Sequence, residues 1–319
     1  METDRSPQRT PTATYLMLLA AVLLWGGNWV AAKLAVGAVP PITLATLRYA
    51  VAAPLLLLWL ARQGPLPRVE RRDLLPLLAL GVLYGVASNL LFLVGLQFAP
   101  SVDGAILYPG FQPVFAALIA VVLLGELLRG RQLFGFAVAL AGLVLVVGGG
   151  QASASGGQAR LLGDLMFLAG AIIWAYTNVL ARLISRRLSP MAVTTYSALI
   201  CLPLLLLLSL LLEDGWARLP SALPWAWPSL GYMALVSTGP PTLFFYTGIR
   251  RLGVARASAF SYLIPVSGVA FTVLLLGEAV LPLQIAGGLL VLVGLWLVSR
   301  PATASSVQQL RILRQESRP

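Results

Sequence analysis

Two long stretches of the chain resemble each other, and each contains an odd number of apolar segments long enough to cross a membrane. An apolar run, a tryptophan, a basic residue and a proline recur at the same intervals, at 16–20, Trp25, Lys33 and Pro41, and at 165–169, Trp174, Arg182 and Pro190. A proline and a Leu-Leu-Gly-Glu sequence then recur, at Pro113 and Glu126 and at Pro265 and Glu278. A repeated unit with an odd number of spans must enter the bilayer in two opposite orientations, as in many secondary transporters.

The composition indicates that these apolar segments are membrane spans. Hydrophobic residues make up 59% of the chain and charged residues only 10%, whereas about a quarter of the residues in a soluble domain are charged. Runs long enough to cross a ~30 Å hydrocarbon core occur at 14–33, 41–61, 74–97, 101–124, 132–149, 161–182, 190–212, 228–249, 256–276 and 282–299. We therefore predict an all-α integral membrane protein with ten transmembrane helices, arranged as a 5+5 inverted repeat around a central cavity.

The same boundaries divide the chain into five parts. A polar tail precedes the first repeat, a linker rich in glycine and serine separates the repeats, and a basic tail follows the second repeat. The expected parts are the cytoplasmic N-terminal tail at 1–13, the first five-helix repeat at 14–149, the linker at 150–160, the second five-helix repeat at 161–299 and the cytoplasmic basic tail at 300–319.

The distribution of positive charge predicts the topology. The net charge is +11, and most arginines fall on one side of the membrane if the N-terminus is cytoplasmic. The loop after the third span has no Lys or Arg, whereas its equivalent after the eighth span has Arg250, Arg251 and Arg256. Because cytoplasmic loops are enriched in Lys and Arg, we predict a multi-pass protein with both termini in the cytoplasm. Anionic lipids, rather than nucleic acid, are then the expected partners of the basic charge.

The excess of arginine over lysine, together with abundant alanine, leucine and glycine, is typical of a GC-rich bacterial genome. The expected location is therefore the inner (plasma) membrane of a bacterium.

Several kinds of chemistry have no residues to support them. The chain has one cysteine, Cys201, and no histidine, so it has no intrachain disulfide and lacks the commonest metal ligand and proton relay. It has no Gly-x-x-x-x-Gly-Lys-Ser/Thr phosphate loop. Integral-membrane transferases typically need an Asp-rich metal motif or a histidine at the membrane face. We therefore predict that the protein is not an enzyme and has no catalytic residue, metal or cofactor.

Amide and aromatic side chains cluster on the first, third, fourth, sixth, eighth and ninth spans. An amide in hydrocarbon needs a hydrogen-bond partner, so these side chains should face the interior of the bundle. A bond to a neighbouring helix would explain any single one equally well, but their clustering favours a substrate-binding site. The candidates are Trp25, Asn28, Asn89, Phe92, Tyr108, Gln112, Trp174, Asn178, Tyr246 and Tyr262.

Prolines predict interruptions in three spans. Pro109 and Pro113 lie in the fourth span and Pro265 in the ninth, and Gly239 precedes two prolines in the eighth. Breaks near the midplane at matched positions often mark the binding site of a transporter. A kink that only serves packing is the alternative, and we favour helix breaks at the site for Pro113 and Pro265.

Charged residues inside or at the ends of spans have separate interpretations. Arg48 lies inside the second span, where a charge indicates either function or a buried ion pair, and Asp103 is a candidate partner. Asp164 is expected to cap the N-terminus of its helix. Glu126 and Glu278 are expected to bond loop amides or a neighbouring helix end. No acid can be placed near the midplane, so facilitated diffusion, exchange or coupling through groups at the helix ends fits better than a midplane proton site.

These features resemble the drug/metabolite transporter (DMT) superfamily, in particular bacterial transporters of the EamA type. The resemblance covers nearly all of 14–299 and is carried by residues 25–29 (Trp-Gly-Gly-Asn-Trp), Arg48, 108–115 (Tyr-Pro-Gly-Phe-Gln-Pro-Val-Phe), 125–126 (Gly-Glu), 256–258 (Arg-Ala-Ser), 262–266 (Tyr-Leu-Ile-Pro-Val) and 277–278 (Gly-Glu). Many relatives have a glutamate where this chain has Ile264, so no role of that acid is carried over. The resemblance implies a ten-helix bundle with a central cavity and the export of amino acids or other small metabolites.

The sequence therefore predicts a secondary transporter that exports a small neutral or zwitterionic metabolite, an amino acid or a related compound, by alternating access. A multiply anionic solute such as a sugar phosphate would need several inward Lys or Arg residues. A flippase of a lipid or lipid-linked sugar on the same architecture is the main alternative, and a non-transporting membrane assembly protein is another. The fifth and tenth spans carry glycine faces, which suit helix packing within a scaffold or a homodimer contact.

Overall fold

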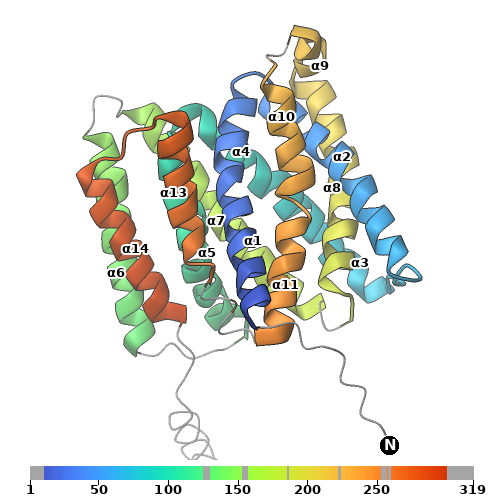
Figure 1. Ribbon diagram of the computed structural model, residues 1–319, viewed down its shortest axis with the longest axis horizontal. Coiled ribbons are helices and arrows are strands. Elements are labelled where there is room, and N and C mark those ends of the chain that lie inside the picture. Colours follow the sequence, from blue (N-terminus) through green and yellow to red (C-terminus); the bar gives the residue numbers. More distant parts are fainter. Residues whose placement is uncertain are drawn as a thin grey trace, which may run out of the picture.

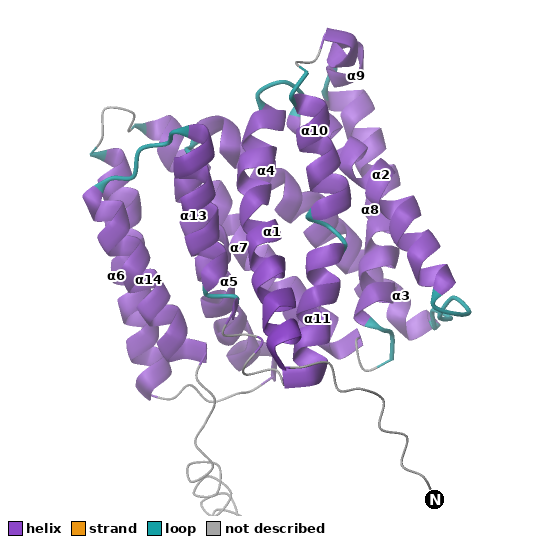
Figure 2. Ribbon diagram, in the orientation of Figure 1, coloured by secondary structure: helices purple, strands orange, loops and turns teal. Residues whose placement is uncertain are grey.

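The computed structural model describes residues 11–124, 130–152, 157–184, 187–221, 224–252, 257 and 260–299. In these residues the protein is all helical (Figures 1 and 2). The helices of the first half are α1 (Pro11–Val36), α2 (Pro41–Arg62), α3 (Arg71–Leu80), η1 (Gly81–Ser88), α4 (Asn89–Phe98), α5 (Ser101–Leu124) and α6 (Gly130–Gln151). Those of the second half are α7 (Gln158–Ile184), α8 (Pro190–Leu212), α9 (Gly215–Arg218), η2 (Leu219–Ser221), α10 (Ala226–Gly231), η3 (Tyr232–Val236), α11 (Pro240–Leu252), α13 (Leu263–Leu276) and α14 (Pro282–Ser299).

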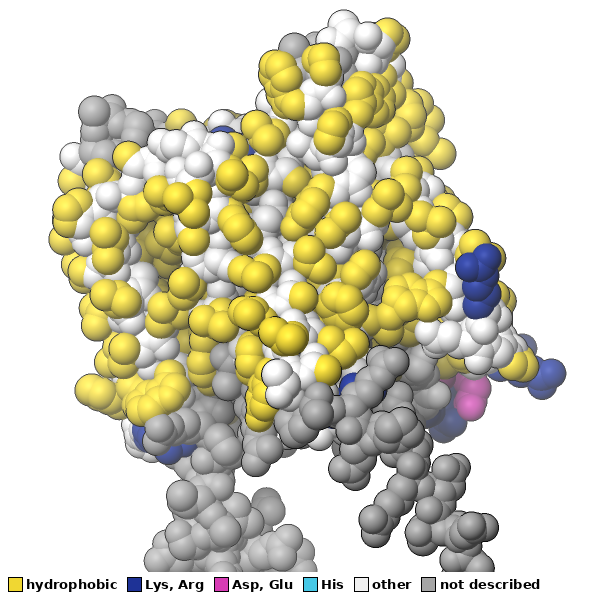
Figure 3. Space-filling model, in the orientation of Figure 1, with side chains coloured by type: hydrophobic (Ala, Val, Ile, Leu, Met, Phe, Trp, Pro, Cys, Tyr) yellow, Lys and Arg dark blue, Asp and Glu magenta, His cyan; other side chains and the backbone are white. Residues whose placement is uncertain are grey.

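Seven of the helices in the described ranges are long and apolar enough to cross a membrane: Thr12–Val36, Pro41–Arg62, Arg71–Phe98, Ser101–Ile119, Gly130–Gln151, Gln158–Ala181 and Pro190–Leu212. Two shorter apolar helices follow at Leu263–Leu276 and Pro282–Val298. Hydrophobic side chains cover the face seen in Figure 3 along the length of the bundle, and most visible charges lie toward its lower edge. The all-helical, multi-pass membrane architecture is therefore confirmed, while the count of ten spans stays a prediction.

Proline fixes where two equivalent helices begin. Pro41 and Pro190 occupy the first turns of α2 and α8, where the missing N–H would have no partner in the helix and the fixed φ suits the first turn. Ser189 adds a cap to α8, because its hydroxyl accepts a hydrogen bond from the Ala192 amide at 3.2 Å. Pro41 and Pro190 thus mark the start of equivalent helices in the two repeats.

The fourth predicted span is not interrupted. α5 continues from Ser101 to Leu124 with Pro109 and Pro113 inside it, so the helix break predicted at Pro113 is wrong. A membrane helix tolerates an internal proline where packed neighbours hold the local backbone, and α5 packs against α7 and α13. Pro265 lies in the first turn of α13, after a turn at Ser261 and Tyr262. The helix break in the ninth predicted span therefore precedes Pro265.

Equivalent helices of the two halves run antiparallel. At the start of α2, the Ile42 and Thr43 amides donate to the Glu213 carboxylate, which follows the end of α8, at 2.9 and 2.7 Å. At the other end, the hydroxyl of Tyr196, in the first turns of α8, donates to the carbonyl of Pro67, which follows α2, at 2.7 Å. We call the end of the bundle at residues 36–41 the α1–α2 end, and the opposite end at residues 62–71 the α2–α3 end.

The second equivalent pair, α6 and α14, packs through glycines (Figure 1). A Cβ on Gly142 would lie 2.6 Å from the Gly287 carbonyl oxygen, and one on Gly294 would lie 2.7 Å from the Gly135 carbonyl oxygen. The predicted close approach of backbones at these glycines is confirmed. Because the two glycine faces contact each other within one chain, they do not supply the homodimer contact considered above.

The Leu-Leu-Gly-Glu sequence ends one helix and holds the start of another. Gly277 takes a left-handed conformation with φ 67° at the end of α13, which glycine adopts without steric cost. The next residue, Glu278, accepts hydrogen bonds from the amides of Ser101 and Val102 at 3.0 and 2.8 Å. Its predicted role at a neighbouring helix end is therefore confirmed. Its counterpart Glu126 lies outside the described residues.

The glycine contact can be tested by adding one methyl group. We expect Gly142→Ala to lower the melting temperature in detergent, because overpacking against the α14 backbone costs about 1–3 kcal/mol. Gly148→Ala is the matched control on the same helix, since a Cβ there meets no atom within 4 Å and alanine favours a helix. Equal melting temperatures for the two variants would contradict the close packing of α6 and α14.

Candidate functional site

One π-helical segment interrupts the third span of each repeat, and the two segments lie at matched positions. η1 follows α3 directly, and η3 follows α10. π-helical turns are rare and are frequent at functional sites. After η3 the chain bends from Ser237 to Gly239 before Pro240 begins α11, so the predicted interruption of the eighth span is confirmed. The apolar pattern of the third span does not predict the irregular helix at η1, although Gly81 and Gly85 weaken a regular helix there.

The local backbone around η3 shows why the helix changes. The Ser237 amide donates to the Tyr232 carbonyl at 2.9 Å, and the Thr238 hydroxyl donates to the Met233 carbonyl at 2.7 Å. Both bonds span five residues rather than four. Pro240 and Pro241 have no N–H to donate, so hydroxyl groups replace part of the regular helix bonding. The result is a bend with polar side chains inside the bundle.

Arg48 of α2 connects the two irregular segments. Its Nε and Nη2 donate to the Thr238 hydroxyl oxygen at 3.2 and 3.1 Å, and its Nη1 donates to Asn89 Oδ1 at 3.3 Å. Asn89 is the residue directly after η1. The ring of Tyr49 lies 5.8 Å from the guanidinium carbon. Within the described ranges Arg48 has no ion-pair partner, so its charge is surrounded by neutral acceptors and aromatic groups.

The predicted pairing of Arg48 with Asp103 is wrong. Asp103 instead receives two hydrogen bonds from Arg160, at 2.7 Å from Nε and 3.0 Å from Nη2. The physical reason is that Arg48 and Asp103 lie at different depths in the bundle. Asp103 is in the first turn of α5 and Arg160 in the first turn of α7, so both are at the α1–α2 end, whereas Arg48 is deeper along α2.

The amides of the first and third spans lie beside this arginine. Asn28 Oδ1 accepts a hydrogen bond from the Ser237 hydroxyl at 2.7 Å. Asn89 is 7% exposed, and its Nδ2 has no partner among the described residues. A buried amide donor without a partner is costly, and such a group is suited to a ligand or water. Arg48, Asn89, Asn28, Ser237 and Thr238 form what we call the Arg48 cluster.

An aromatic group continues from the Arg48 cluster toward α5 and α7. The Tyr108 hydroxyl is 2.7 Å from Ser88 Oγ, and its ring stacks on Trp174 with centroids 5.2 Å apart. Phe92 lies 5.9 Å from Tyr108, and Trp29 lies 4.9 Å from Phe92. Four helices, α1, α4, α5 and α7, contribute these rings. Trp29, Ser88, Ser237 and Thr238 were absent from the predicted site set, although hydroxyl residues before Gly239-Pro240 were a usable signal.

The remaining predicted residues are more scattered. The ring of Trp25 is tilted against the ring of Phe245 of α11, with centroids 5.6 Å apart. Gln112 and Tyr262 are half-buried. Asn178 is exposed in α7, contrary to the expectation that every amide faces the interior. It lies one turn after Trp174 on the same helical face, nearer the α2–α3 end. The side chain of Tyr246 lies outside the described part of the structure.

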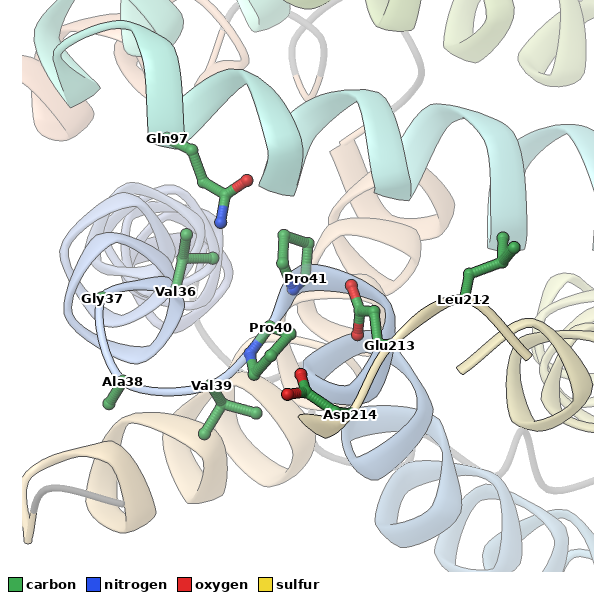
Figure 4. Close-up of a pocket in the computed structure, with 10 residues that line it drawn as sticks. All are labelled: Val36, Gly37, Ala38, Val39, Pro40, Pro41, Gln97, Leu212, Glu213 and Asp214. Atoms are coloured by element: carbon green, nitrogen blue, oxygen red, sulfur yellow. The ribbon is translucent and has the colours of Figure 1, made fainter. Parts of the chain in front are cut away.

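A pocket of about 550 Å³ lies elsewhere, at the α1–α2 end (Figure 4). It is lined by Val36, Gly37, Ala38, Val39, Pro40, Pro41, Gln97, Leu212, Glu213 and Asp214. None of these residues belongs to the predicted site, and both oxygens of Glu213 are bound to the start of α2. In the described ranges no group of three or more His, Cys, Asp or Glu side chains is placed to hold a metal ion.

Known proteins resemble this chain over most of its length. The model of the EamA-like transporter family matches twice, at residues 12–148 and 161–300. A "Probable amino-acid metabolite efflux pump" of Escherichia coli (strain K12) is 30% identical, with 88% of this chain and 93% of that protein covered. "Uncharacterized transporter YyaM" of Bacillus subtilis (strain 168) is 27% identical over 88% of this chain and 91% of its own length. A solved crystal structure has the same fold, with a TM-score of 0.62, 24% identity, and coverage of 89% of this chain and 95% of that one.

The contact between Arg48 and Thr238 can be measured by a double-mutant cycle. Thr238→Val should destabilise the detergent-solubilised protein by roughly 1–3 kcal/mol, because it removes an acceptor from a half-buried charge. The loss should shrink on an Arg48→Met background, where no charge is left without its acceptor. Thr242→Val serves as the control, since that hydroxyl donates to a carbonyl one turn earlier. Additive losses for Thr238→Val and Arg48→Met would contradict the coupling.

Proposed function

Because this chain belongs to the EamA-like transporter family, we propose that it is a secondary transporter that exports a small zwitterionic or neutral metabolite from the cytoplasm by alternating access. The relative from Escherichia coli is named a probable amino-acid metabolite efflux pump, which supports an amino acid or a related compound as the solute. Membership of a transporter family supports transport rather than catalysis.

The architecture that we propose for this function is ten helices in two inverted repeats around a central site. The double match of the family model supports two copies of one unit. The antiparallel packing of α2 with α8, and of α6 with α14, supports inversion, since these are equivalent helices. We retain 1–13 and 300–319 as tails, 14–149 and 161–299 as repeats and 150–160 as the linker.

The orientation that we propose places the α2–α3 end in the cytoplasm. The described basic residues at that end include Arg62, Arg68, Arg71, Arg72, Arg131, Arg187 and Arg251, and those at the α1–α2 end are Lys33, Arg160 and Arg218, the last residue of α9. Positive charge is enriched on the cytoplasmic side of bacterial inner-membrane proteins. Both termini are then cytoplasmic, and solute leaves through the α1–α2 end.

The Arg48 cluster is the observation that carries the proposal. A guanidinium binds a carboxylate through two parallel hydrogen bonds, and such charge-assisted bonds are typically about 2.7–2.9 Å long. The present contacts of Arg48 with neutral oxygens, at 3.1–3.3 Å, are longer. A solute carboxylate can therefore replace them at a gain in energy, and the unpartnered Asn89 amide adds a donor nearby.

The site also offers groups that can bind the ammonium group of a zwitterion. The Asn28 carbonyl and the Ser237 hydroxyl offer acceptors for an ammonium group, and the stacked rings of Tyr108 and Trp174 offer π faces that attract a cation. One guanidinium balances one carboxylate, so a multiply anionic solute would remain uncompensated here. The site therefore favours an amino acid over a sugar phosphate.

Exchange by purified protein in liposomes tests the proposal. In counterflow with radiolabelled amino acids, Arg48→Met should weaken exchange roughly ten- to a hundredfold, because two charge-assisted hydrogen bonds are lost. Trp174→Ala should also lower exchange, and Trp227→Ala, an exposed tryptophan of α10, should leave it unchanged. Amino-acid amides should fail to compete with the wild type, since they lack the carboxylate.

Two results would count against amino-acid export. Unaltered exchange in both Arg48→Met and Trp174→Ala would remove the Arg48 cluster from the pathway. Movement of a labelled lipid between leaflets, without counterflow of any amino acid, would favour the flippase alternative instead.

The proposed orientation has its own test. An epitope tag inserted between Ala152 and Gly157, both exposed, should be reached by antibody on spheroplasts with intact inner membranes. A tag after Gly64, in the loop at the α2–α3 end, is the control and should be reached only after permeabilisation. The reverse pattern would place the α1–α2 end in the cytoplasm and refute the topology.

A further inference from the structure

A second group of charges is buried at the α1–α2 end, separate from the Arg48 cluster. Asp103 and Asp164 are 0% exposed and Arg160 is 5% exposed. Lys33 and Glu278 lie within electrostatic reach of Asp103. The group comes from α1, α5, α7 and the segment between α13 and α14, and consists of Lys33, Asp103, Arg160, Asp164 and Glu278.

Four of the five side chains have defined partners. Arg160 donates to both oxygens of Asp103, which also accepts a hydrogen bond from Gln284 Nε2 of α14. Glu278 holds the first amides of α5. Lys33 donates to the carbonyls of Leu96 and Ala99 at the end of α4, at 2.5 and 3.0 Å.

Asp164 is the exception. It lies in the second turn of α7, which begins at Gln158, so the predicted role as N-terminal cap is wrong. Neither of its oxygens receives a hydrogen bond from a donor in the described residues. It lies one turn after Arg160 on the same face of α7, the face from which Arg160 donates to Asp103. The carboxyl groups of Asp103 and Asp164 are therefore neighbours and interact electrostatically. Two ionised carboxylates would repel in this position, and an unpartnered buried carboxylate is costly by several kcal/mol.

A single proton removes both the repulsion between the two carboxylates and the cost of burying one of them without a partner. A protonated carboxyl group has an O–H that can donate a hydrogen bond to the neighbouring carboxylate. The charge of the group supports the same state. Three carboxyl groups face two cations, Lys33 and Arg160, and a single proton makes the group neutral.

We propose that Asp103 and Asp164 form a proton-binding site in which the two carboxyl groups share one proton, and that this site couples transport to the proton gradient. The second half of the proposal rests on the transport function proposed above. The proton comes from water at the α1–α2 end, forms an O–H bond with one carboxyl group, and returns to water when that bond breaks, so no other reactant is needed. The sequence pointed away from a midplane proton site, and this pair is at the helix ends.

The position of the pair explains how a proton changes the conformation. Asp103 is on α5 of the first repeat, and its partners Asp164 and Gln284 are on α7 and α14 of the second repeat. Arg160 is in the first turn of α7, at the junction of the linker with that repeat. The shared proton therefore holds the two repeats together at the α1–α2 end. Loss of the proton leaves two neighbouring buried carboxylates, whose repulsion favours separation of the repeats and opening of this end.

Infrared spectroscopy of the purified protein tests the proton site without any solute. The wild type should show the C=O band of a protonated carboxyl group at neutral pH, and Asp164→Glu should keep it. Asp164→Asn should lose the band, as should Asp103→Asn. The control Glu213→Gln should leave it unchanged, since Glu213 accepts three hydrogen bonds at the start of α2. A wild-type protein without this band, or an Asp164→Asn variant that retains it, would overturn the site.

Liposomes that contain a pH-sensitive dye test the coupling. When an equimolar mixture of the twenty common amino acids is added on one side, the wild type should move protons in the opposite direction. Asp164→Asn should lose the proton movement, and its amino-acid counterflow should be slower than that of the wild type because the α1–α2 end then opens less readily. Proton movement that persists in Asp164→Asn would refute the coupling. The infrared band without any amino-acid counterflow in the wild type would refute the proposed function and the coupling, and would leave the proton site standing.

Discussion

The hydrocarbon interior of a bilayer offers no hydrogen-bond partners, and the structure of this protein follows from that constraint. A spanning helix satisfies its own central backbone but not its first amides or last carbonyls. Here the other repeat supplies several of the missing partners. Glu213 of the second half holds the start of α2, and Glu278 holds the start of α5. The contacts that satisfy helix ends are therefore the contacts that join the two repeats.

The same constraint separates rigid from adaptable parts. α6 and α14 pack through glycine backbones with no space to adjust, which suits a scaffold. The third span of each repeat instead contains a π-helical segment. At the end of η3, hydroxyl groups make part of the bonding to the helix carbonyls. Polar side chains are concentrated beside these segments, so the part of the bundle that is best able to change its bonding is also the part that carries the Arg48 cluster.

Two arginines in the bundle show how surroundings decide a role. Arg160 makes a two-point ion pair with Asp103 and is almost fully buried. Arg48 has only neutral acceptors in the described ranges, at distances longer than charged hydrogen bonds usually have. A fully paired arginine fixes a structure, whereas an arginine with weak neutral partners can exchange them for a carboxylate. For this reason we assign solute binding to Arg48, and proton-linked closure to the charged groups around Arg160.

The sequence by itself determined the helical membrane class, the spacing of the repeats and the positions of most helices, because apolar periodicity and proline act locally. It also indicated the close glycine contact and the structural role of Glu278. Only the tertiary structure decided that Arg48 bonds Thr238 and Asn89, that Asp103 pairs with Arg160, and that Asp164 has no donor among the described residues. These partners are far apart in sequence, and their meeting depends on the height and rotation of each helix in the bundle. Continuity of α5 through Pro113 likewise depends on its packed neighbours, which no local pattern specifies.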